Sequence, residues 1–147
     1  MKQEFISPER FFELLYVEPS FCQSIGKVML AVGALETQLR RYLRARDVTG
    51  VRANATLGSM VGLLKKHKLL SLNGELLFNA LALKRNYLAH SIYDLFNFEV
   101  DETLLPRSEL VELDVQLFSD RAKGLADDFN HFRAVVSSAD PATPRLL

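Results

Sequence analysis

The residues FCQSIGKVMLAVGALETQLRRY, from Phe21 to Tyr42, decide the fold class of this 147-residue chain. Apolar side chains recur there at alternating spacings of four and three residues, namely Phe21, Ile25, Val28, Val32, Leu35, Leu39 and Tyr42. This spacing places all of them along one side of an α-helix of about six turns. It therefore predicts a core helix that continues to about Arg46.

The sequence around this helix contains the start and stop signals of further helices. Ser7-Pro8-Glu9 predicts a short helix that ends at about Tyr16, and we expect Pro19 to end that region. The core helix would then begin at Ser20 to Gln23, which resembles a capping box. Thr56 can cap a third helix that ends in the basic residues 65–68.

Two long helices are expected in the second half of the chain. Asn73-Gly74 predicts a break, followed by a helix from about Gly74 to Phe96 and a loop over 97–105. Pro106 and Ser108 predict the start of the last helix. The fold class is therefore all-α, an antiparallel up-and-down bundle of four main helices plus a short N-terminal helix. We expect a single domain over residues 1–136 and a flexible tail over 137–147.

Composition and charge exclude several classes of protein. Cys22 is the sole cysteine, which excludes a disulfide framework and a four-cysteine zinc site. The sequence contains neither an apolar membrane span nor a signal peptide at its start, so we expect a soluble, cytoplasmic protein without membrane contact. From Arg40 to Arg85 there are ten Lys or Arg residues and two acids. This basic region either binds phosphates or is a solubilising surface that pairs with the acidic C-terminal third.

The stretch KRNYLAHS, from Lys84 to Ser91, places polar residues inside the fourth main helix. On a helical wheel one stripe is apolar and should face the core: Leu77, Leu81, Leu88, Ile92 and Leu95. A second face is polar but uncharged, with Leu83 among Asn79, Asn86, His90 and Asn97. Tyr93 and Asp94 flank this second face. Such a face favours a polar groove or an interface over a solvated surface.

The run Arg85-Asn86-Tyr87-Leu88-Ala89-His90 resembles the signature of the HEPN superfamily, in which Arg, a polar residue and His lie on one helix of a small α-bundle. Glu36 and Leu39, Leu57-Gly58 and the acidic region after the motif extend the resemblance over most of residues 20–136. It implies a homodimer whose motif helices, residues 79–97, face each other. It also implies metal-independent RNA cleavage, often by a toxin or defence effector, with Arg85, Asn86 and His90 as the site.

The motif residues suit this chemistry. Histidine can take or give a proton near neutral pH, and a symmetric dimer supplies two of them. Arginine can hold the phosphate and stabilise the charge that develops on it. We expect supporting roles for Glu36, Tyr93 and Asp94. The candidates for RNA contact are basic: Arg40, Arg41, Arg44, Lys65, Lys66 and Lys84. No metal or cofactor is expected.

Several alternatives remain open. Glu36 either pairs with Arg40 one turn along its helix or orients Arg85 across the bundle. His67 and His131 fit solvated surface positions better than catalytic or metal sites. HEPN toxins with nucleotidyltransferase antitoxins typically carry Tyr two residues after the His, where this chain has Ile92. Modification by such an antitoxin is therefore not expected, and an antitoxin protein stays an open alternative as a partner. The rival functions are a non-catalytic HEPN-like binding or assembly module and a purely structural bundle.

Overall fold

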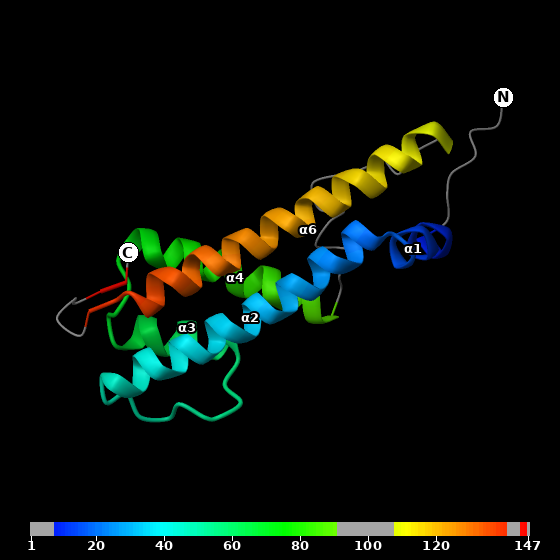
Figure 1. The fold of residues 1–147 in the computed structure, drawn as a ribbon. Coiled ribbons are helices and arrows are strands. Elements are labelled where there is room, and N and C mark those ends of the chain that lie inside the picture. Colours follow the sequence, from blue (N-terminus) through cyan, green and yellow to red (C-terminus); the bar gives the residue numbers. More distant parts are fainter. Residues whose placement is uncertain (1–7, 91–107, 141–144, 147) are drawn as a thin grey trace.

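The computed structural model describes residues 8–90, 108–140 and 145–146, and the side chains of residues 10–86, 115–140 and 145–146. Within these residues the chain forms α-helices joined by short connections (Figure 1). The helices are α1 (Pro8–Tyr16), α2 (Pro19–Ala45), α3 (Leu57–Lys66), α4 (Leu72–His90) and α6 (Ser108–Ser137). The all-α class is confirmed. The predicted loop over 97–105 lies outside the described residues.

Helix α2 buries the seam that the sequence predicts. Ile25 is partly buried, and the other members of the seam are buried. The start of the helix differs from the expectation, because Pro19 is its first residue and does not end the preceding region. The Glu18 side chain caps the helix by accepting from the backbone N–H of Ser20 at 3.3 Å. A proline suits this position because the first helical residue has no intrahelical partner for an N–H.

The starts of α3 and α4 both depend on a hydroxyl cap. Thr56 Oγ1 accepts from the backbone N–H of Ser59 at 3.3 Å, which confirms the predicted cap of α3. Ser71 Oγ accepts from the N–H of Gly74 at 3.0 Å, so α4 begins at Leu72. The break predicted at Asn73-Gly74 is therefore wrong, because Ser71 supplies the cap and both residues lie in the first turn.

Helices α2 and α6 pack against each other more extensively than any other pair, and they run in the same direction (Figure 1). Near the start of α2, Phe11 of α1 packs edge-on against Phe118 in the third turn of α6, in a cluster that also contains Phe21 of α2. Just beyond their last turns, Arg46 donates to the backbone carbonyl of Asp140 at 3.0 Å. The strict up-and-down order is not confirmed, because it requires the first and last main helices to be antiparallel.

The connection from residue 46 to residue 56 explains this arrangement. It runs back along α2, where Arg40 and Arg44 donate to the carbonyls of Ala55 and Val51 at 3.3 and 3.4 Å. Helix α3 therefore begins beside the middle of α2, with the N–H of Leu57 bound to Glu36. It proceeds in the same direction as α2, and α4 returns antiparallel to α3 (Figure 1). A loop, and not a helix, makes the first reversal of the chain.

The end of the described chain is packed, in contrast to the flexible tail predicted for residues 137–147. Leu146 is 2% exposed and belongs to the main core cluster. Its backbone forms an isolated parallel bridge with Leu70, in which the N–H of Leu146 donates to the carbonyl of Leu69 at 2.7 Å. Residue 137 itself lies in α6. This segment therefore fastens the turn between α3 and α4 to the rest of the bundle.

Candidate functional site

The buried face of α4 leads directly to Arg85. Phe78, Leu81 and Ala82 are the buried apolar residues described on this helix, and Phe78 packs edge-on against Phe132 of α6. Residues 78, 81 and 85 follow each other at spacings of three and four, so they share one face. Arg85 thus continues the core face of α4 and points between the helices. The predicted apolar stripe is wrong at Leu77, which is 38% exposed.

Glu36 of α2 forms an ion pair with Arg85 of α4. The Nε of Arg85 donates to Oε1 of Glu36 at 3.2 Å, and the two side chains are 24% and 14% exposed. The same oxygen accepts from the backbone N–H of Leu57, the first residue of α3, at 3.1 Å. One carboxylate thus joins α2, α3 and α4. Of the two roles considered for Glu36, the structure shows the contact with Arg85, while Arg40 binds the loop instead.

This contact leaves part of the Arg85 guanidinium available. Arg85 uses Nε for Glu36, and neither Nη atom has a hydrogen-bond partner among the described residues. The guanidinium offers donors along two edges, so an anion can bind at the Nη atoms while Glu36 holds the Nε edge. Glu36 thereby fixes the orientation of the group before any ligand arrives.

The other motif residues occupy the far part of α4. Asn86 is exposed, and its side chain has no hydrogen-bond partner among the described residues. His90 is the last residue of α4, one helical turn beyond Asn86, and its side chain lies outside the described ones. The flanking Tyr93 and Asp94 also lie outside the described residues.

The basic candidates have different surroundings. Arg40 and Arg44 hold the 46–56 connection through its carbonyls, which gives both a role in the fold. Lys65 forms an ion pair of 3.3 Å with Glu75. The remaining candidates have no ion-pair partner among the described residues: Arg41, Lys66 and Lys84. The first two of these are exposed, and the third is half-buried.

The other histidines lie away from this site. His67 caps the C-terminus of α3 and is exposed. His131 is exposed on α6, with its ring 5.5 Å from that of Phe132. Among the described residues no three His, Cys, Asp or Glu side chains are grouped so that they could hold a metal ion. No described helix is long and apolar enough to cross a membrane.

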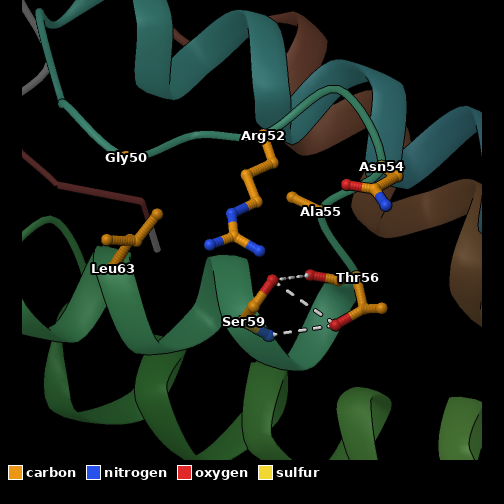
Figure 2. A pocket seen from close by; sticks show the side chains of 7 residues that line it. All are labelled: Gly50, Arg52, Asn54, Ala55, Thr56, Ser59 and Leu63. Atoms are coloured by element: carbon orange, nitrogen blue, oxygen red, sulfur yellow. Dashed lines mark hydrogen bonds between the residues drawn. The ribbon is translucent and has the colours of Figure 1, made fainter.

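A pocket that the sequence did not predict lies between the 46–56 connection and α3 (Figure 2). Its volume is about 440 Å³, and its lining consists of Gly50, Arg52, Asn54, Ala55, Thr56, Ser59 and Leu63. Residues 47–55 are the interval between two predicted helices, and the sequence predicted no site in them. The available signal was an arginine and an asparagine beside a glycine within the basic region, but only the path of the loop over α3 makes a pocket of them.

No protein-family model, curated protein or solved structure matches this chain. The functional argument therefore rests on the residues of the chain and on their geometry.

Proposed function

We propose that this chain is a HEPN-type endoribonuclease that acts as a dimer, without a divalent metal ion, as a toxin or defence effector in the cytoplasm. The observation that carries the proposal is the Arg85–Glu36 contact, which orients a guanidinium in the motif helix and leaves its Nη atoms for a phosphate.

The proposed reaction uses the RNA 2′-hydroxyl as the nucleophile. One His90 takes the proton of this hydroxyl, the oxygen attacks the adjacent phosphorus, and the bond from phosphorus to the 5′-oxygen breaks. His90 of the second copy gives a proton to the departing 5′-oxygen. Arg85 stabilises the charge on the phosphate oxygens, and Asn86 binds the phosphate or orients His90. The products are a 2′,3′-cyclic phosphate and a 5′-hydroxyl.

The outer face of α4 supports the dimer. Leu72, Leu76 and Leu83 are 78%, 64% and 56% exposed, and Asn79 and Asn86 lie among them. Residues 72, 76, 79, 83 and 86 follow each other at spacings of three and four, so they form one continuous outer face. Apolar side chains gathered in this way favour contact with another protein surface. A two-fold dimer through this face brings two motif helices together.

The experiment that tests the proposal digests RNA and DNA of the same sequence in excess chelator. We expect cleavage of the RNA alone, with 2′,3′-cyclic phosphate ends, because DNA lacks the nucleophile. Arg85→Ala and His90→Ala should each remove cleavage while circular dichroism shows unchanged helix content. Equal activity of the wild type and both variants contradicts the assignment, and so does activity that returns only with magnesium.

The dimer is tested by Leu83→Glu, which places a charge on the outer face. We expect light scattering at micromolar concentration to change from dimer to monomer, and RNA cleavage to fall with it. The matched control is Leu30→Glu, because Leu30 is 77% exposed on α2. If the wild type is a monomer, the dimer is wrong. A stable dimer that binds RNA or a partner protein without cleaving favours the non-catalytic HEPN-like module.

A further inference from the structure

The pocket between the 46–56 connection and α3 has a preorganised wall. The N–H of Ala55 donates to the carbonyl of Arg52 at 3.1 Å, which closes a turn over residues 52–55. Arg40 and Arg44 fasten this turn and its approach to α2. Val51 and Ala55 also pack against the main core cluster. The backbone that carries the pocket side chains is thus held from two sides before a ligand binds.

The free donors of the pocket come from this wall. Figure 2 shows the Arg52 side chain extending from the connection towards α3, with its guanidinium near Ser59 and Leu63. The side chains of Arg52 and Asn54 have no hydrogen-bond or ion-pair partner among the described residues. Thr56 and Ser59 bind each other through hydroxyl and backbone groups. A guanidinium and an amide are therefore the groups that remain for a ligand.

Charge and size restrict the ligand. Residues 40–85 contain ten basic residues, and one of their two acids, Glu75, is paired with Lys65. An anion is therefore favoured. A volume of about 440 Å³ is in the lower part of the range of ~300–1,000 Å³ for small-ligand pockets. It suits one nucleotide unit better than a folded or paired strand. Leu63 adds an apolar wall against which a base can lie.

We infer that this pocket binds one nucleotide unit, with Arg52 on its phosphate, Asn54 on a polar edge and Leu63 against the base. The inference rests on the proposed function for its ligand class, and it makes the pocket a specificity subsite for the RNA. The pocket is linked to Arg85 through Leu57 and Glu36. Thr56 lines the pocket, and the next residue, Leu57, binds the Glu36 oxygen that also holds Arg85.

The experiment measures binding to the full, ¹⁵N-labelled chain. The probes are each of the four nucleoside monophosphates, inorganic phosphate, and a 2′-O-methyl RNA tetramer, whose blocked 2′-oxygen prevents cleavage. We expect saturable shifts of the Gly50 and Ser59 amide signals with nucleotides and with the tetramer. Tighter binding of the tetramer assigns the pocket to an RNA strand, and equal or tighter binding of the mononucleotides assigns it to a free nucleotide. Both results support binding of one nucleotide unit in the pocket, and the second contradicts its role as an RNA subsite.

Arg52→Gln provides the decisive variant, because it removes the charge from an exposed side chain. We expect binding about tenfold weaker and, for the tetramer, a salt-dependence slope smaller by about 0.7, the contribution of one phosphate contact on a single strand. Lys123→Gln makes the same change of charge on the exposed surface of α6 and should leave both quantities unchanged. The inference is overturned by shifts that occur only outside the pocket, by the absence of saturable shifts, or by equal affinity of Arg52→Gln and the wild type.

RNA cleavage separates this inference from the proposed function. We expect Arg52→Gln to raise the KM for RNA and to leave kcat nearly unchanged. Cleavage by the wild type without nucleotide binding at Gly50 and Ser59 contradicts nucleotide binding by the pocket and is consistent with the proposed ribonuclease activity. Arg52-dependent nucleotide binding by a chain that never cleaves RNA supports the pocket and contradicts the ribonuclease.

Discussion

The inner and outer faces of α4 differ in the kind of residue that each contains. The described part of the inner face runs from the buried Phe78 and Leu81 to a charged arginine, Arg85, which pairs with Glu36 through its Nε. The outer face exposes leucines at positions 72, 76 and 83, separated by asparagines. A helix that only completes a bundle normally has the opposite distribution, with its charges outside and its leucines inside. This distribution fits the roles that we propose for α4, phosphate contact at Arg85 and dimer contact on the outer face.

The largest difference in the free energy of unfolding is expected between an apolar residue of the inner face and one of the outer face. Phe78 is fully buried and Leu76 is 64% exposed, so their truncation should have unequal costs. We expect Phe78→Ala to lower the free energy of unfolding by about 3–5 kcal/mol, because it removes a core ring and leaves a cavity. Leu76→Ala should change it by no more than about 0.5 kcal/mol.

Urea unfolding at low protein concentration measures both variants without a contribution from dimer formation. If Leu76→Ala costs as much as Phe78→Ala, the outer face is part of the core and the contrast between the faces is wrong.

A smaller effect is expected from the polar end of the inner face. Glu36→Gln keeps an oxygen for the N–H of Leu57 and removes the charge opposite Arg85. We expect a loss of about 1–2 kcal/mol in unfolding free energy, below the cost for fully buried pairs because water reaches Arg85. We also expect a lower kcat for RNA cleavage, because the guanidinium loses its orientation.

Glu75→Gln is the matched control for this pair. It removes the partner of Lys65 in an ion pair whose side chains are 41% and 38% exposed. Its cost should lie within about 0–1 kcal/mol, with kcat unchanged. Equal losses of unfolding free energy and kcat for Glu36→Gln and Glu75→Gln would mean that the Glu36–Arg85 contact contributes no more than an exposed ion pair.

The smallest effect concerns the buried hydroxyl of Tyr42, which has no geometrically formed hydrogen bond within the described part of the chain. The Arg46 guanidinium lies 3.6 Å from the centre of the Tyr42 ring. We expect Tyr42→Phe to change the stability at pH 7 by less than about 0.5 kcal/mol or to raise it slightly, because no bond is lost.

The pH dependence of this variant follows from the same hydroxyl. Burial raises the pKa of Tyr42 above 10.0, although Arg46 acts in the opposite direction. A raised pKa in the folded state means that the unfolded chain loses this proton first as the pH rises. Stability should therefore fall above about pH 10 in the wild type and fall less in Tyr42→Phe. Thermal unfolding between pH 8 and 11 measures the difference, and parallel curves contradict it.

The sequence predicted those elements whose signals are local. The apolar seam of α2 can be recognised from the helical spacing alone, and the Thr56 cap can be recognised from Thr56 and the three residues that follow it. The inner face of α4 was predicted less well, because leucines lie on every side of that helix and periodicity alone cannot choose between them. Phe78 reaches the core against Phe132, a contact that depends on the position of α6.

The features that the sequence did not determine depend on the path of the 46–56 connection. An up-and-down order assumes that each helix reverses its predecessor, but here Arg40 and Arg44 hold a returning loop against α2. The same two arginines looked like phosphate contacts in the sequence, where their carbonyl partners cannot be seen. The link between Glu36 and Arg85 was one of two alternatives, because the spacing from Glu36 to Arg40 supports a local pair equally well.

During synthesis on the ribosome, Leu146 follows Leu70 by about 75 residues, which takes several seconds at ~5–20 residues per second. Until then the carbonyl of Leu69 and the N–H of Ser71 lack the backbone partner that the bridge provides. The apolar seam of α2 also stays uncovered until α6, its most extensive packing partner, has been synthesised. A nascent chain at this stage exposes the apolar face of α2 and leaves the backbone groups of Leu69 and Ser71 without their later partner.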